Sequence, residues 1–70
     1  MTDIRDIEIT GESIRLGQLL KLAGIARSGG EAKLLLASGV LVNGLAEARR
    51  GRRLQRGDRV EADGETVRVA

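Results

Sequence analysis

Residues 16–44, LGQLLKLAGIARSGGEAKLLLASGVLVNG, hold the signals that decide the fold. The first part of this stretch has apolar side chains at the spacing i, i+3, i+4 and i+7, which places them on one face of a helix. They are Leu16, Leu19, Leu20 and Ala23. Gly24 follows at once, and glycine readily adopts the left-handed conformation that ends a helix. The stretch therefore predicts a first helix that begins at Leu16 and ends at Gly24.

A second helix is predicted from Ser28 to Gly39. Ser28 followed by Glu31 forms a capping box, in which a serine oxygen and a glutamate carboxylate accept hydrogen bonds from free N–H groups at the helix start. The apolar residues Ala32, Leu35 and Leu36 continue the helical pattern. The linker between the helices is short, so we expect the two helices to fold back and pack together.

Three turn signals predict antiparallel strands around this helix pair. Asn43-Gly44 follows Val40 and Val42 and is typical of a tight hairpin, with a return arm from Leu45 toward Ala48. Gly57-Asp58 marks a turn, and Asp63-Gly64 repeats the hairpin signal. The strands expected around these turns contain alternating apolar residues: Ile7 and Ile9, Val60 and Ala62, Val67 and Val69. The prediction is an α+β fold, with two packed helices on one face of a small, twisted antiparallel sheet.

The 70 residues suffice for one domain with a thin core, so we expect a single domain over residues 1–70 with its core at about 7–69. The chain has no cysteine and no histidine, which excludes disulfides and the usual zinc ligand sets and predicts no metal or cofactor. The longest apolar run, Leu34 to Ala37, is far too short for a membrane helix. We expect a soluble, cytoplasmic monomer.

The charge is unevenly distributed along the chain. Residues 49–59 contain six arginines and one acid, a net charge of +5, whereas the rest, with six basic and nine acidic residues, carries −3. Arginine outnumbers lysine ten to two, and its planar guanidinium matches phosphate oxygens with two hydrogen bonds. This uneven distribution of charge favours a polyanionic partner, although a charged face that only keeps the protein in solution is the simpler alternative.

The composition also limits the chemistry. Without histidine, cysteine or tyrosine, no nucleophile stands beside a recognisable base, so we predict a protein without enzymatic activity. The chain has no aromatic residue and cannot stack unpaired bases as common single-strand readers do. A nucleic-acid partner would be read through its shape and its phosphates.

Several ordered motifs resemble the RNA-binding domain family called S-four, after a protein of the small ribosomal subunit. The core motifs are Arg15-Leu16, Leu20, Gly24-Ile25-Ala26, Ser28, Ala32-Lys33, Gly39 and Val42-Asn43-Gly44. Glu47, the arginine-rich residues 49–54 and Gly57-Asp58-Arg59-Val60 are similar to the tail of small stand-alone bacterial members. The resemblance implies the S-four αL motif, in which structured RNA, ribosomal or transfer, lies against the helix pair and the adjoining loop. A ribosomal or RNA-processing protein is a further possible partner.

Carried over residue by residue, the resemblance implies RNA contacts by Arg15 and Lys21 in the first helix. At the start of the second helix it implies contacts by Arg27, Ser28 and Lys33. Asn43 would complete this surface, although turn formation alone explains Asn43-Gly44. Free N–H groups near Gly29 and Gly30 could bind a phosphate directly, or the two glycines could only ease a tight turn. For the main electrostatic contact we select the arginines at positions 49, 50, 52 and 53, namely Arg49, Arg50, Arg52 and Arg53.

This sequence departs from the family pattern at three places. Gly17 stands where many members have aspartate, and Gly29 stands where many have an arginine that would contact phosphate. The family usually has one more residue between the positions of Gly39 and Val40, so the family pattern does not predict the corner between helix and strand here. The arginines of residues 49–53 could compensate for the charge that is missing at position 29.

Two other functions remain compatible with the residues. A protein-interaction module could dock an acidic partner on its arginine face. A helix-turn-helix protein that binds DNA would also have two helices joined by a short turn. A recognition helix needs several polar side chains directed at base edges. The second helix has Lys33 as its only basic residue, and Leu34, Leu35 and Leu36 come next, which argues against DNA binding.

Overall fold

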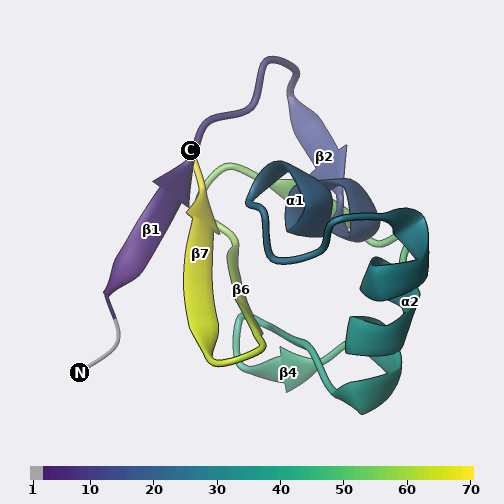
Figure 1. The fold of residues 1–70 in the computed structure, drawn as a ribbon. Helices are drawn as coiled ribbons and strands as arrows, with labels where there is room; N and C mark the ends of the chain where they lie inside the picture. Colours follow the sequence, from purple (N-terminus) through teal and green to yellow (C-terminus); the bar gives the residue numbers. More distant parts are fainter. Residues whose placement is uncertain (1–2) are drawn as a thin grey trace.

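The computed structural model describes residues 3–70. Within them the chain forms two helices and seven short strands (Figure 1). The elements in chain order are β1 (Ile4–Ile7), β2 (Ser13–Arg15), α1 (Leu16–Leu22), α2 (Gly29–Ser38), β3 (Leu41–Val42), β4 (Leu45–Ala46), β5 (Arg53–Gln55), β6 (Arg59–Ala62) and β7 (Glu65–Val69). The α+β class predicted from the sequence is therefore confirmed.

The strands form a mixed sheet and a separate two-stranded ribbon. The sheet has the order β1-β7-β6-β3-β4, and the ribbon pairs β2 with β5. All the pairings are antiparallel except that of β1 with β7, which is parallel. The prediction of a purely antiparallel sheet was thus wrong. Two neighbouring parallel strands need a long connection along the chain. Here residues 8–64 form that connection, while β1 and β7 lie side by side (Figure 1).

Both helices form where the sequence placed them. The Ser28 side chain caps α2 by accepting a hydrogen bond from the Glu31 amide at 3.2 Å. In a capping box the glutamate accepts a hydrogen bond from the amide of the capping residue, here Ser28. The Glu31 carboxylate instead accepts from the amide of Arg27, one residue earlier, at 3.3 Å. Gly24 and Gly39 follow the two helices with φ of 75° and 124°. The corner at Gly39 therefore forms with a backbone conformation that glycine tolerates.

The two predicted hairpin turns are confirmed. Asn43 and Gly44 have φ of 52° and 84°, and Asp63 and Gly64 have φ of 52° and 76°. Two successive positive φ angles are what a two-residue hairpin turn of type I′ requires. The return arm expected from Leu45 toward Ala48 is shorter as a strand, because β4 ends at Ala46.

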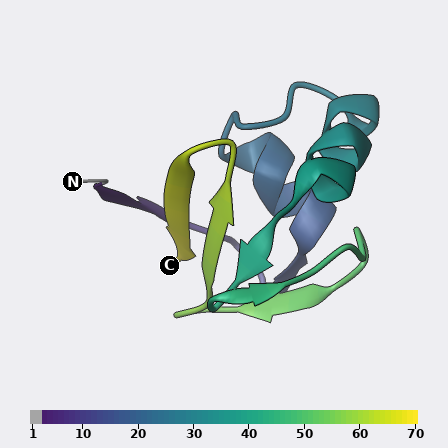
Figure 2. The same ribbon diagram turned by 90° about the horizontal axis from the view of Figure 1, so that it is seen from below.

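The core lies between the helices and the strands, with the helices grouped on one side (Figure 2). It contains fifteen buried apolar residues and, among residues 3–70, no buried polar or charged residue. Leu16, Leu19 and Leu20 of α1 are fully buried, as are Leu54, Val60 and Val67 of the strands. None of the helices in residues 3–70 has the length and apolar character to cross a membrane.

The β2–β5 ribbon was not anticipated from the sequence. Ile14 lies opposite Leu54, and Arg15 lies opposite Arg53. Leu54 is fully buried and Ile14 packs partly against the core, so the apolar pair anchors the ribbon. The ribbon brings the start of α1 next to residues 47–52, the arginine loop, which is separated from it by more than thirty positions in the sequence.

Candidate nucleic-acid interface

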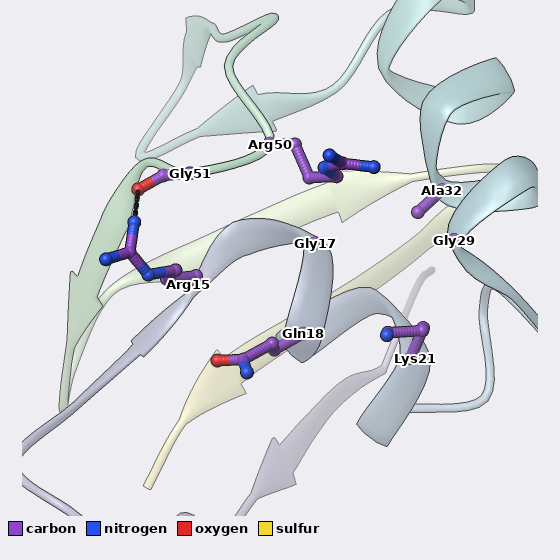
Figure 3. A pocket seen from close by; sticks show the side chains of 8 residues that line it. All are labelled: Arg15, Gly17, Gln18, Lys21, Gly29, Ala32, Arg50 and Gly51. Atoms are coloured by element: carbon purple, nitrogen blue, oxygen red, sulfur yellow. Dashed lines mark hydrogen bonds between the residues drawn. The ribbon is translucent and has the colours of Figure 1, made fainter.

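Four of the predicted binding residues line one hollow of about 350 Å³. Arg15 lies at the end of β2, directly before α1, and not in the first helix as the resemblance implied. Lys21 lies in α1, Gly29 at the start of α2 and Arg50 in the arginine loop. This cationic hollow is lined by Arg15, Gly17, Gln18, Lys21, Gly29, Ala32, Arg50 and Gly51 (Figure 3). No lining residue is acidic. Within residues 3–70, none of its three cations forms an ion pair with a carboxylate.

Arg50 belongs to the arginine loop and lines the cationic hollow together with residues of both helices. Figure 3 shows its side chain extending above Gly17 toward Ala32 and Gly29 at the start of α2. Arg50 also borders a second hollow, lined by Lys33, Leu36, Ala37, Ala48 and Arg50. The predicted contacts Arg50 and Lys33 therefore line one hollow together, and Arg50 lines both hollows.

The arginine loop is tied to the beginning of α1 through its backbone. The amides of Leu16 and Gly17 donate to the carbonyls of Arg52 and Arg50 at 2.8 and 2.9 Å. These bonds satisfy two of the N–H groups that a helix start leaves free. A Cβ added at Gly17 would collide with Arg50 Cγ and lie only 3.1 Å from its Cδ. Glycine is thus required where Arg50 crosses the helix, a role of Gly17 that the sequence did not reveal.

The start of α2 is open on the side of the hollow. A Cβ added at Gly29 would have no atom within 4 Å, and one at Gly30 would meet only Ser28 Oγ at 3.7 Å. Neither glycine has a positive φ. Packing and backbone conformation therefore do not explain why both positions are glycine. Arg27 is exposed on the linker just before this helix.

Two of the four selected arginines are already paired. Arg49 Nε lies 3.2 Å from Glu47 Oε2, and Arg52 Nη1 lies 2.8 Å from Glu47 Oε1. The hydrogen bonds from Arg49 and Arg52 lower the pKa of Glu47 from its ordinary 4.5 to about 2. The same pairing raises the pKa of Arg49. Arg50 and Arg53 have no such partner within the described part of the chain.

Asn43 lies outside the hollow and has a structural role. Its amide nitrogen donates to Asp58 Oδ1 at 3.1 Å, and its amide oxygen accepts from the backbone N–H of Arg59 at 2.9 Å. The side chain thus ties the β3–β4 turn to the beginning of β6. A contact of Asn43 with RNA stays a prediction.

Ligands for a metal ion are not gathered at this surface. In residues 3–70 no group of three or more His, Cys, Asp or Glu side chains is arranged to hold a metal. The surface instead offers guanidinium and ammonium groups, two hollows and the first turn of a helix. Such an arrangement can neutralise phosphates and donate hydrogen bonds to their oxygens.

Two comparisons with known proteins identify the family of this chain. The family model of the S4 domain matches residues 7–70, which include both helices and the arginine loop. A Bacillus subtilis (strain 168) protein named "Probable ribosome maturation protein RlbA" is 52% identical over 59 residues, which are 83% of this chain and 83% of that protein. The match spans most of the chain, and the resemblance noted in its motifs is thereby confirmed. The chain belongs to the S4 family of RNA-binding domains.

Proposed function

We propose that this protein binds structured ribosomal RNA without catalysis and acts in ribosome maturation. The observation that carries the proposal is the cationic hollow, which is lined by Arg15, Lys21 and Arg50 from three segments and by no acidic residue. The name of the Bacillus subtilis relative, which refers to ribosome maturation, favours ribosomal over transfer RNA. This work would take place in the cytoplasm, with the protein as a monomer.

The proposed contact surface covers the two hollows and their borders. Its residues are those predicted from the sequence: Arg15, Lys21, Arg27, Ser28, Gly29, Gly30, Lys33, Arg49, Arg50, Arg52 and Arg53, with Asn43 as an outlying position. Phosphates would lie on the cations, and the N–H groups of the first turn of α2 add a positive helix end beside Lys21 and Arg50. Since the chain has no aromatic residue, recognition would use backbone geometry and 2′-hydroxyl groups rather than base stacking.

Fluorescence anisotropy tests this proposal with three labelled ligands: a ribosomal RNA hairpin, a single-stranded RNA and a DNA duplex. Each is titrated at several salt concentrations with the wild type, Arg50→Ala and the control Arg59→Ala. Arg59 is an exposed arginine of β6 that lines neither hollow. We expect the hairpin to bind best, and Arg50→Ala to bind about tenfold more weakly, as for one exposed charge-assisted contact.

The salt dependence identifies the lost contact. The slope of log K against log salt should be shallower for Arg50→Ala by up to about 0.9, if the value for duplex DNA applies. Arg59→Ala should keep the wild-type slope. Equally poor binding of all three ligands by the wild type at low salt would refute RNA binding and direct attention to an acidic protein partner.

A further inference from the structure

Glu47 is the acidic residue at the beginning of the arginine loop, and its side chain is only 9% exposed. Its carboxylate accepts five hydrogen bonds. Oε2 accepts from the amides of Ala48 and Arg49, both at 3.1 Å, and from Arg49 Nε at 3.2 Å. Oε1 accepts from Arg52 Nη1 at 2.8 Å and from Arg49 Nη2 at 3.3 Å. Both carboxylate oxygens therefore accept hydrogen bonds from later residues of the arginine loop.

The backbone on both sides of this cluster is also fixed. The Glu47 amide donates to the carbonyl of buried Val40 at 2.9 Å, and the Arg52 amide donates to the carbonyl of Arg49 at 3.2 Å. At the far end of the loop, the carbonyls of Arg50 and Arg52 accept from α1. Glu47, Arg49 and Arg52 thus form a hydrogen-bonded cluster, here called the frame, which fixes the arginine loop between the core and the first helix.

The arginines of the loop are of two kinds: those that pair with Glu47 and one that does not. Arg49 and Arg52 turn toward Glu47, and the Arg52 side chain is 38% exposed. Arg50 has no carboxylate partner in residues 3–70 and extends over Gly17 into the cationic hollow (Figure 3). A long side chain that is already placed loses less conformational entropy when it binds a ligand.

We propose that Glu47 is a positioning residue for RNA binding, which holds Arg49 and Arg52 as a fixed frame so that Arg50 is presented to an RNA phosphate. This inference rests on the proposed function of the same surface. It assigns Arg49 and Arg52 mainly to the frame and Arg50 to the phosphate. It also gives Glu47, an acid beside the most basic part of the chain, a role that favours binding of a polyanion.

The substitution Glu47→Gln separates positioning from simple charge. If Glu47 only screens the arginines, its neutralisation should raise RNA affinity and steepen the salt dependence. If Glu47 positions Arg50, Glu47→Gln should lower affinity for the hairpin about three- to tenfold, the loss expected when one long side chain is no longer preorganised. The matched control is Glu61→Gln, which removes an equal charge from an exposed residue of β6. It should leave affinity unchanged or raise it slightly.

A double-mutant cycle on the hairpin gives a readout that general destabilisation would not produce. Arg50→Ala should weaken binding less in the Glu47→Gln background than in the wild type, because Arg50 is no longer held in place. Equal losses in both backgrounds, or tighter binding by Glu47→Gln, would overturn the positioning role while leaving the proposed function intact. Absence of hairpin binding by the wild type would instead refute the proposed function, and the inference with it.

Folding of the variants is checked by circular dichroism and urea unfolding. If Glu47→Gln does not fold, Arg52→Gln opens the same frame from the other side, and the cycle is repeated with it. The same reduced effect of Arg50→Ala is expected in that background. An undiminished effect there would overturn the inference.

Discussion

Arg53 of β5 lies directly opposite Arg15 of β2, and neither forms an ion pair with a carboxylate of residues 3–70. Like charges that face each other across two strands destabilise the pairing. A second arginine pair in the molecule behaves differently. Arg59 lies opposite Arg68, but Arg68 donates to both carboxylate oxygens of Asp6 at 2.9 and 3.2 Å. The uncompensated pair is the one beside the cationic hollow.

This difference predicts opposite effects on stability and binding for one substitution. Arg53→Gln should raise the free energy of unfolding by roughly 0.2 to 0.5 kcal/mol, because it removes the repulsion from Arg15. It should also weaken binding of the RNA hairpin. Urea unfolding and anisotropy measure the two effects. The control Arg59→Gln should change neither property, and a variant Arg53→Gln that is less stable but binds normally would contradict the assignment.

Gly17 should be essential for placing Arg50. A methyl group at Gly17 would collide with Arg50 Cγ, so Gly17→Ala must shift that side chain from its position over α1. We expect a loss of hairpin affinity similar to that of Arg50→Ala, about tenfold, in a protein that remains folded. In the double variant the two losses should not add. Wild-type affinity of Gly17→Ala, measured by anisotropy, would show that Arg50 has no fixed role.

Gly29→Ala tests whether RNA approaches the backbone of α2. The free protein has room for the methyl group, and alanine favours a helix over glycine, so stability should rise by up to about 1 kcal/mol. A phosphate that contacts the first turn past Gly29 would meet the methyl group, and hairpin affinity should fall. If urea unfolding shows the gain in stability and anisotropy shows no loss of affinity, RNA does not approach the backbone at Gly29.

The lowered pKa of Glu47 predicts a dependence of stability on pH. Since the folded protein holds this carboxyl at about 2 instead of 4.5, its ionised form stabilises the folded state. The contribution is complete above about pH 4.5 and is lost as pH falls from there toward 2. Urea unfolding of the wild type and Glu47→Gln should therefore converge over that interval. A constant difference between the two from pH 7 to pH 2 would contradict this ion-pair geometry.

The sequence predicted the elements that local signals define. The helix that Ser28 caps and the turns at Asn43 and Asp63 depend on neighbouring residues, and the structure contains them. The first strand was only partly predicted, because it covers Ile4–Ile7 while Ile9 follows it. Ile7 and Ile9 do pack against the core, as their alternation indicated.

The missing predictions concern contacts between distant parts of the chain. Strand β2 has three residues, only one of them apolar, and it becomes a strand by pairing with β5 about forty residues later. The parallel pairing of β1 with β7 likewise depends on the path of the whole chain. Composition identified the arginine cluster, but it could not show that Glu47 pairs with Arg49 and Arg52 or that Gly17 admits Arg50.

The most direct test of the RNA-binding surface is an NMR titration of the labelled 70-residue protein with the ribosomal RNA hairpin. Backbone amide shifts should concentrate on the residues that line the cationic hollow, with Arg50, Gly51 and Gly29 among the largest, and the β1–β7 edge should change little. Shifts at Asn43 would show whether its predicted contact is made. Chemical-shift changes centred on β1 and β7, or no changes when the RNA hairpin is in excess, would contradict RNA binding at the cationic hollow.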